Sequence, residues 1–177
     1  MKKLKYSSPF YSRDYFSKNI LPNSVYAGRK SIRQQIPFKQ HDELELLLVR
    51  RGEGTVTVNA TQFPIRRGDM FCFSPCHFHK IDVDRSGALE VSECHINSGL
   101  YFYITACPYF QSTPDADLPY PPLHVRLDEP DTRRTELLID DIAAESEKTD
   151  VRDNQQCFFL LMKLFGIMER AAEKNES

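Results

Sequence analysis

The sequence predicts a mainly β domain followed by two C-terminal α-helices. Between residues 38 and 80, short apolar runs alternate with turn residues such as Gly, Asn and Pro, which is typical of an antiparallel β meander. A Pro-rich segment at residues 111–122 ends this region, and after residue 131 apolar residues recur at helical spacing. We therefore expect an arm over residues 1–37, a β domain over residues 38–127 and a two-helix segment over residues 131–174.

The composition is that of an ordinary soluble globular protein, with 41% hydrophobic and 27% charged residues in a chain of 177 residues. No apolar run approaches the ~20 residues needed to cross a bilayer, and the N-terminus lacks the apolar core of a signal peptide. The five cysteines include no C-x-x-C pair, which argues against a disulfide framework or a thiolate zinc site. We expect a cytoplasmic protein that has reduced thiols and no membrane partner.

The arm over residues 1–37 is basic and aromatic. It carries eight Lys or Arg residues against one acidic residue, Asp14, with six Tyr or Phe side chains interleaved. We expect the aromatic side chains to anchor the arm on a neighbouring surface, with a strand near Val25–Arg33. A solvated arm, an arm that meets an anionic partner, and a single-stranded nucleic acid site are the alternatives.

The first strands of the β domain follow from composition and turn residues. Residues Leu44–Arg51 are almost wholly apolar, which indicates a strand that is buried on both faces or lies in a barrel wall. A turn at Gly52–Gly54 leads to a half-buried strand over Thr55–Val58, and Asn59 with Ala60 occupies a two-residue hairpin position.

The later strands are shorter. Phe63–Arg66 contains Pro64, which indicates an edge strand or a bulge. Further strands are expected at Met70–Phe73, Leu89–Ile96, Leu100–Thr105 and His124–Leu127.

Two helices follow. The first has cap candidates at Pro130, Asp131 and Thr132, and a break is expected at Lys148–Asp150. The second, from about Asp153 to Lys174, shows two adjacent apolar stripes, whereas a helix on a single core normally shows one stripe little more than ~100° wide. We therefore predict a homodimer through this helix; the alternative is that both stripes are buried within one protomer. The predicted interface residues are Phe158, Leu161, Leu164, Phe165 and Met168.

The candidate functional site lies at the ends of the 38–80 stretch. Lys39, His41 and Glu45 have the same parity, so a regular strand would place them on one face, and His79 follows the last strand of the stretch. They could hold a metal ion, contact an organic ligand or form a buried hydrogen-bonded cluster. Phe71, Phe73 and His95 complete the candidate ligand-binding set, while His77 and His124 are expected at the surface.

The 38–80 stretch also carries a set of motifs: His41–Val49, Gly52–Gly54, Asn59 at the hairpin, Gly68–Phe71, and Pro75 followed by His79. This set resembles the cupin family and, more closely, the N-terminal effector-binding domain of AraC-type transcriptional regulators. The resemblance implies a cupin-like β-barrel (a double-stranded β-helix or jelly roll) over residues 38–127 with a ligand cavity. It also implies a helical pair for dimerisation and a separate DNA-binding domain.

The resemblance implies a regulatory domain that binds a small-molecule effector and reaches DNA only through that further domain. A paired helix-turn-helix domain would need roughly a hundred more residues after the second helix, so we expect it to be absent from these 177 residues. The chain is then either an excised regulatory domain or a stand-alone cupin. Sugars, aromatic acids and peptides are all open as effectors, and Lys39 with the basic arm favours an anionic one.

Metal-binding cupins resemble one another in offering His-x-His, a Glu and a further His. Here His41, Glu45 and His79 correspond to the second His, the Glu and the final His, while Lys39 stands at the first position. A Lys ammonium opposes a divalent cation and would instead neutralise Glu45. We therefore expect no cofactor and no catalytic residue. The alternatives are a metal-dependent cupin oxygenase or isomerase that uses His41, Glu45 and His79, and a purely structural dimerisation module.

Overall fold

The computed structural model describes residues 25–75, 77–84, 87–100, 123–148 and 151–176. The strands within these residues are β1 (Val25–Ile32), β2 (Ile36–Lys39), β3 (Leu44–Arg51), β4 (Gly54–Val58), β5 (Thr61–Ile65), β6 (Asp69–Phe73), β7 (His79–Val83), β8 (Leu89–Ile96) and β9 (His124–Arg126). Two long helices follow them, α3 (Glu129–Ser146) and α4 (Val151–Glu176).

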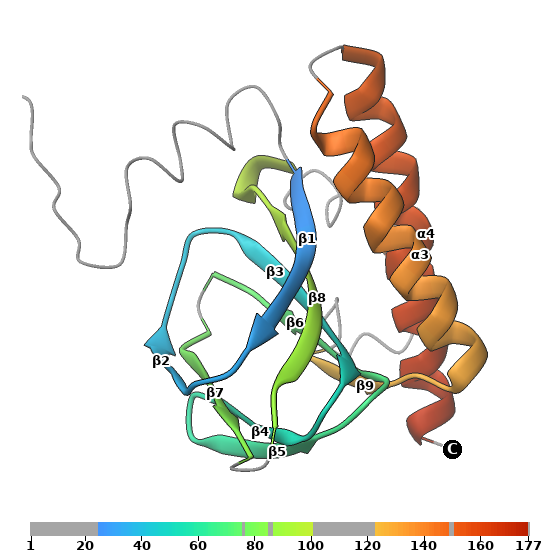
Figure 1. Ribbon diagram of the computed structural model, residues 1–177. Coiled ribbons are helices and arrows are strands. Elements are labelled where there is room, and N and C mark those ends of the chain that lie inside the picture. Colours follow the sequence, from blue (N-terminus) through green and yellow to red (C-terminus); the bar gives the residue numbers. More distant parts are fainter. Residues whose placement is uncertain (1–24, 76, 85–86, 101–122, 149–150, 177) are drawn as a thin grey trace, which may run out of the picture.

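The strands form two antiparallel sheets that face each other as a flattened barrel (Figure 1). The five-stranded sheet has the order β1-β8-β3-β6-β9, and the four-stranded sheet has the order β2-β7-β4-β5. Among the described strands only β4 and β5 are neighbours both in sequence and in a sheet. The meander prediction is therefore wrong in its connectivity, but the predicted fold class, a mainly β, cupin-like jelly-roll barrel followed by two helices, is confirmed.

The connectivity differs because two of the predicted turns carry the chain from one sheet to the other. Gly52 (φ 93°) lies between β3 and β4, and Gly68 (φ 88°) lies between β5 and β6. A Cβ atom at Gly52 would lie 2.6 Å from the carbonyl oxygen of Ala88, so this position requires glycine both for its backbone conformation and for its close approach. Turn composition predicted where the chain bends, but not the sheet it enters next.

Strand β3 is buried on both faces, as its apolar composition predicted. Leu47 and Val49 point into the barrel, where they pack with Phe71 and Phe73 of β6. The alternate residues of β3 point outward and pack under the helices; they are Leu44, Leu46 and Leu48. The same outer layer contains the buried side chains of Cys72, Cys94 and Cys157.

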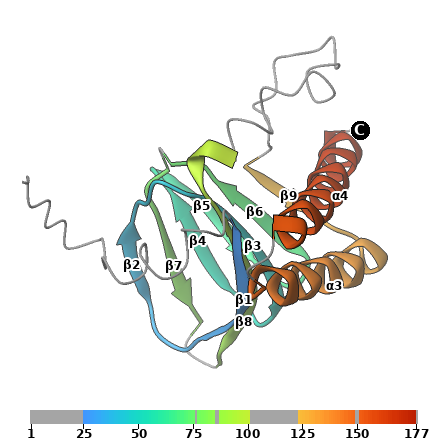
Figure 2. The same cartoon turned by 90° about the horizontal axis from the view of Figure 1, so that it is seen from above.

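Helices α3 and α4 lie side by side on the outer face of the five-stranded sheet (Figure 2). The break expected at Lys148–Asp150 is confirmed, since α3 ends at Ser146 and α4 begins at Val151. The N-cap of α3 is Asp128 instead of the expected Pro130–Thr132, because the Asp128 carboxylate accepts the backbone N–H of Asp131 at 2.9 Å. Neither helix, as far as its residues are described, is long and apolar enough to span a bilayer.

The barrel begins earlier than the predicted boundary at residue 38. The strand expected near Val25–Arg33 is β1, and it pairs with β8 from Val25↔Ile96 to Ile32↔Leu89. Strand β2 also begins before the boundary, at Ile36. Residues 1–24 of the predicted arm lie outside the described part. The strand expected at Leu100–Thr105 is not formed at its first residue, because residues 98–100 are helical, and residues 101–105 also lie outside the described part.

Most of the predicted dimer interface is buried inside the protomer. Phe158 is partly buried, whereas the other four residues, Leu161, Leu164, Phe165 and Met168, are at most 1% exposed. These four pack with α3 and with the outer layer of the five-stranded sheet. The prediction that they form a dimer contact is wrong for this conformation, because the sheet and α3 together cover the stripe that was assigned to a second copy.

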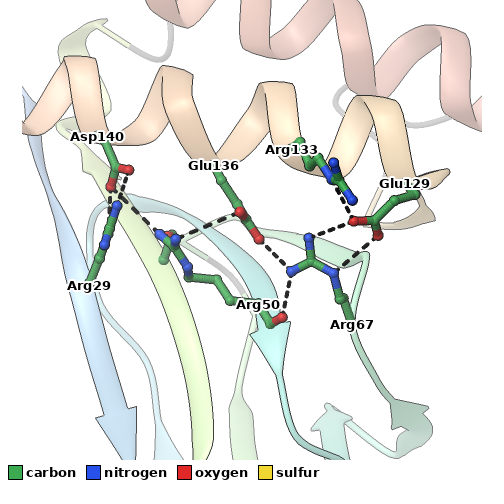
Figure 3. A network of polar contacts seen from close by, with 8 residues as sticks. Arg29, Arg50, Arg67, Glu129, Arg133, Glu136 and Asp140 are labelled. Atoms are coloured by element: carbon green, nitrogen blue, oxygen red, sulfur yellow. Dashed lines mark hydrogen bonds and ion pairs between the residues drawn. The ribbon is translucent and has the colours of Figure 1, made fainter.

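Helix α3 is attached to the barrel by charge as well as by apolar packing (Figure 3). Arg29 of β1, Arg50 of β3 and Arg67 of the β5–β6 turn all contact acidic side chains of α3. We call this set the ion-pair seam; its acidic members are Glu129, Glu136 and Asp140. Arg67 is its most connected member: it donates to Glu136 at 2.6 Å and to Glu129 at 3.1 Å, and also to the Arg50 carbonyl at 2.6 Å.

Candidate functional site

Glu45 is the centre of the candidate site. It lies on the inner face of β3, opposite Phe73 of β6 and His95 of β8, and its side chain is completely buried. Its Oε2 atom accepts hydrogen bonds from Lys39 Nζ at 2.8 Å and from His41 Nε2 at 2.7 Å. His79 Nε2 lies 3.3 Å from the same oxygen but is not aligned for a hydrogen bond. The structure thus brings together the four polar residues that the sequence singled out.

These four residues are not brought together by a shared face of one strand, as the sequence predicted. Lys39 ends β2 in the four-stranded sheet and Glu45 belongs to β3 in the five-stranded sheet, so they do not share one strand face. Residues 40–43 cross between the two sheets and carry His41. Lys39 pairs with His79 in the β2–β7 ladder. The site therefore forms where the two sheets approach each other at one end of the barrel.

His41 is held between two oxygen acceptors. Its Nδ1 atom lies 2.9 Å from the Glu43 carbonyl oxygen, and its Nε2 atom lies 2.7 Å from Glu45 Oε2. Since both oxygens only accept, both hydrogen bonds exist together only when the ring carries two protons. His41 therefore acts towards Glu45 as a donor.

His79 is completely buried and lies flat on Phe73, with ring centroids 4.0 Å apart and planes 5° apart. Its Nδ1 atom lies 3.3 Å from the His77 carbonyl oxygen, a contact in which the ring must donate. In the neutral ring this leaves Nε2 as an acceptor. Within the described residues, neither His79 Nε2 nor Glu45 Oε1 has a hydrogen-bond partner.

A second buried acid–base pair adjoins Glu45. Glu43 Oε2 accepts a hydrogen bond from His95 Nδ1 at 2.9 Å, and the His95 ring lies 5.7 Å from that of His41. His95 belongs to the predicted ligand-binding set, whereas Glu43 does not, although Glu43 has the same parity as Glu45. We name these residues the Glu45 cluster: Lys39, His41, Glu43, Glu45, His79 and His95.

Burial and neighbouring charges shift the pKa values of the Glu45 cluster in opposite directions. Burial alone would raise the pKa of Glu45, but the charge of Lys39, followed by the hydrogen bond from His41 and the contact with His79, holds that pKa well below its usual range. Burial lowers the pKa of His79, and Glu45 offsets only part of the effect. Burial also acts to lower the pKa of His95, but the hydrogen bond to Glu43 and the charge of Glu45 raise it overall. Glu45 is therefore ionised and His79 neutral near neutral pH.

Phe71 and Phe73 lie inside the barrel and are completely buried. Phe71 stacks on Phe73 and also on His124 of β9, at centroid distances of 5.5 and 4.5 Å. His124 Nε2 lies 2.8 Å from the buried Asp69 Oδ1, and its side chain is 26% exposed, so His124 lies at the surface only in part. Asp69 Oδ2 also accepts from Arg126 at 2.6 Å. Local composition could not indicate this pairing, because Asp69 and His124 are 55 positions apart.

Three side chains of the Glu45 cluster could in principle act as metal ligands. Ligand atoms of His41, Glu45 and His95 lie within 4.8 Å of one another, so the compact triad includes His95 instead of the expected His79. However, Glu45 Oε2 already accepts from His41 and from the ammonium group of Lys39. A divalent cation would have to displace Lys39, because the two positive charges repel each other. This donor set fits an ion-pair network better than a metal centre.

The sequence was compared with models of known protein families, and one family matches. The model of the AraC-like ligand-binding domain matches residues 22–177. The curated proteins contain no sequence that matches this chain.

Solved structures similar to the chain include cupins. One is the cupin domain of Schizosaccharomyces pombe Cnp3, with 21% identity and a TM-score of 0.41 over 46% of this chain and 61% of that chain. Another is a cupin 2 conserved barrel domain protein from Rhodopseudomonas palustris (16% identity, TM-score 0.39, 42% of this chain and 53% of that one). A third is a mutant salicylate 1,2-dioxygenase from Pseudoaminobacter salicylatoxidans (22% identity, TM-score 0.39, 41% and 22%). The chain thus spans less than two thirds of the length of each of these three.

Proposed function

The chain belongs to the family of AraC-like ligand-binding domains, and from this premise we propose that it senses a small-molecule effector through the Glu45 cluster. The observation that carries the proposal is the fully buried Glu45 carboxylate, one oxygen of which has no donor among the described residues, beside the equally buried and unpaired Nε2 of His79. Effector binding at this point gives the domain its regulatory role.

The two unpaired atoms, Glu45 Oε1 and His79 Nε2, carry an energetic cost. A buried polar atom without a partner costs about 1–3 kcal/mol, and more when the group is charged. Proteins therefore pair almost all such atoms with protein groups, ordered water or ligands. Two of them side by side form a place where a ligand atom gains more than it would elsewhere in the barrel.

The strands that carry the cluster also support the helices. On β3, Glu45 faces the barrel interior while Leu44 and Leu46 pack beneath the helices. On β8, His95 contacts Glu43 while Cys94 and Ile96 pack in the outer layer. An effector that favours one position of β3 and β8 therefore favours one position of α3 and α4. The mechanism is a shift in the population of two arrangements, which requires the effector to bind them with different affinity.

The output surface is the exposed side of α4. Phe159 is 58% exposed and its ring lies 6.0 Å from that of Phe158, which is partly buried. Exposed aromatic side chains on a long helix are suited to a symmetric contact, so the regulator acts as a homodimer through this side of α4. It contacts DNA through a separate helix-turn-helix domain and works in the cytoplasm.

The domain is not an enzyme and needs no resident metal, because Lys39 neutralises Glu45. The competing function is a metal-dependent cupin oxygenase or isomerase, which the compact arrangement of His41, Glu45 and His95 favours. Elemental analysis of the chain purified without chelator separates the two functions. Stoichiometric iron, zinc or manganese that is lost in His41→Ala would favour the enzyme.

The test of effector sensing is a thermal-shift screen of the whole chain against sugars, aromatic acids and short peptides, followed by calorimetry on the hits. At least one class should raise Tm in a saturable way, since a ligand that binds only the folded state stabilises it. The gain should disappear in Glu45→Ala and persist in Thr135→Val. Thr135 is a matched control because it is also fully buried with an unpaired oxygen, but it lies on α3. If no compound shifts Tm, the proposal fails.

A further inference from the structure

We infer that the contact between His124 and Asp69 couples the Glu45 cluster to the start of α3. The cluster lies at one end of a continuous stack of four rings, and Asp69 lies at the other end. We name this stack the ring column; its members are His79, Phe73, Phe71 and His124. The inference rests on the proposed function and adds a regulatory connection to the helices that is separate from β3 and β8.

Glu45 holds the first end of the ring column. His79 Nε2 lies 3.3 Å from Glu45 Oε2, and the His79 ring lies flat on Phe73, with planes 5° apart. Glu45 and His79 are both completely buried. A close-packed interior leaves little room for one ring to move without its neighbour. A change in the position or charge of Glu45 therefore shifts His79, and with it Phe73.

The middle of the ring column transmits such a shift. Phe73 and Phe71 both project from β6 and are completely buried, with ring centroids 5.5 Å apart and planes 16° apart. Phe71 stacks in turn on His124, with centroids 4.5 Å apart. Phe63 of β5 lies edge-on to Phe71 at 5.7 Å and supports the column from the side. Because densely packed side chains transmit strain, displacement of one ring displaces the next.

His124 lies on the segment that leads directly into α3. Strand β9 ends at Arg126, and Asp128 is already the N-cap of the helix. The His124 side chain is fixed by its stack on Phe71 and by Nε2, which lies 2.8 Å from Asp69 Oδ1. A shift of His124 must therefore move the start of α3 or break the contact with Asp69.

Asp69 connects the same point to the ion-pair seam. It is completely buried, and its Oδ2 atom accepts a hydrogen bond from the backbone N–H of Arg66 at 2.7 Å. This bond closes the turn that carries Arg67, whose guanidinium donates to Glu129 of α3 at 3.1 Å. A buried carboxylate is costly to leave without a donor, so the contact with His124 is either made or replaced. Such an element with two discrete arrangements is what coupling between distant sites requires.

Amide hydrogen exchange on the whole chain tests the connection without an effector. Glu45→Gln disturbs the first end of the ring column. It should speed exchange at residues 132–136, in the first half of α3, by at least about threefold relative to residues 142–146, in the second half. His124→Leu keeps an apolar side chain on Phe71 but loses the contact with Asp69. In the His124→Leu background, Glu45→Gln should leave the exchange ratio unchanged.

Thr57→Val is the control variant. Thr57 is buried with an unpaired oxygen, like Glu45, but it lies on β4 and outside the ring column. Thr57→Val should leave the exchange ratio of the two halves of α3 at the wild-type value. An equal rise in Thr57→Val and Glu45→Gln would overturn the coupling, because the start of α3 would then respond to any buried change.

Urea denaturation of the wild type, Glu45→Gln, His124→Leu and the double variant gives a double-mutant cycle. Distant, independent sites add to within about a factor of two in the unfolding equilibrium constant, whereas this pair should deviate from additivity by at least about fivefold. If Glu45→Gln does not fold, His79→Gln starts the same cycle, because it breaks the stack at its first ring.

The coupling and the proposed function fail separately. Additive free energies, or an exchange ratio that rises equally with and without His124, would overturn the coupling and leave effector sensing to its own screen. A coupled cycle in a protein whose Tm no compound shifts would overturn effector sensing and retain the coupling.

Discussion

The imidazole ring of His79 and the phenyl ring of Phe73 are stacked almost parallel, with centroids 4.0 Å apart and planes 5° apart. Phe73 rests on Phe71, and Phe71 rests on His124, so four rings in contact extend through the barrel from Glu45 to Asp69. The orientation of His79, and with it the direction of its free nitrogen, therefore depends on an apolar core residue.

Truncation of Phe73 should damage both stability and the site. Phe73→Ala removes a completely buried ring and should lower the free energy of unfolding by about 3–5 kcal/mol. Urea denaturation would measure the loss, and effector affinity should fall as His79 loses its support. Leu137→Ala is the control, because Leu137 is 66% exposed and its truncation should change stability by less than about 0.5 kcal/mol. Equal losses in the two variants would contradict the buried stack.

Arg67 should hold the start of α3 on the barrel. It contacts Glu129 and Glu136 of the helix together with the Arg50 carbonyl of β3, and Figure 3 shows that it bridges the two layers. Arg67→Ala should cost about 1 kcal/mol, since the group is partly exposed, and should speed amide hydrogen exchange in the first half of α3. The difference from the wild type should shrink in high salt.

The matched control for Arg67 is Arg133→Ala. Arg133 donates to the same Glu129 at 2.8 Å, but it lies on α3 itself and is 73% exposed. Removing it should leave exchange in α3 close to that of the wild type. An equal increase in exchange for both variants would mean that the seam stabilises the helix internally and does not attach it to the barrel.

Low pH should weaken the contact between Arg67 and Glu129 that holds α3 on the barrel. The hydrogen bonds from Arg67 and then from Arg133 lower the pKa of Glu129 to about 2. A lowered carboxyl pKa adds stability that is present above the unfolded value of about 4.3 and is lost as the pH falls through the folded value. The exchange difference between wild type and Arg67→Ala should therefore be constant near pH 6 and disappear towards pH 2. A difference that persists at pH 2 would exclude the ionised Glu129 as its source.

His95 should make stability depend on pH in the opposite sense. Its pKa is raised in the folded state, because the hydrogen bond to Glu43 outweighs burial. The resulting stabilisation is fully present below the unfolded value of about 6.5 and is lost as the pH rises through the folded value. Urea denaturation from pH 5 to 9 should give a difference between wild type and His95→Gln that is largest at acidic pH. A difference that grows with pH would show that His95 is buried as the neutral ring.

Two positions on α4 should separate folding from association. Leu161 is completely buried in the protomer core, so Leu161→Asp should unfold the domain. Phe159 is 58% exposed, so Phe159→Asp should leave the circular dichroism and Tm close to the wild-type values. If α4 forms the homodimer, Phe159→Asp should sediment as a monomer where the wild type is a dimer. A folded Phe159→Asp dimer would place the interface elsewhere.

Local patterns were most accurate where burial is uniform. The predicted bounds of β3 match the structure because both of its faces are covered as far as Val49, so that, apart from Glu45, these positions are apolar. The pattern was weaker for β1, an edge strand whose residues Arg29 and Lys30 are exposed and form ion pairs with partners far along the chain. Its charge led to the assignment of residues 25–37 to an arm.

The site was predicted in part for a similar reason. His41, Glu45 and His79 stand out because ionisable side chains are unusual beside apolar runs. Glu43 and the Asp69–His124 pair were missed, since their significance depends on partners 52 and 55 positions away. The interface residues on α4 were assigned wrongly because helical spacing shows that a stripe is apolar but not which neighbour covers it.

Short-range regularities in the chain were enough to establish a mainly β domain, two helices, the resemblance to the AraC-type effector domain and most of its polar site. These regularities can be recognised in the sequence because side-chain direction repeats every two residues in a strand and every 3.6 residues in a helix. The choice of sheet for each strand, the unpaired oxygen of Glu45 and the buried stripe of α4 followed from packing instead. These features arise from contacts between residues distant in sequence, and their free energy depends on which groups exclude water from one another, a property that no single segment carries.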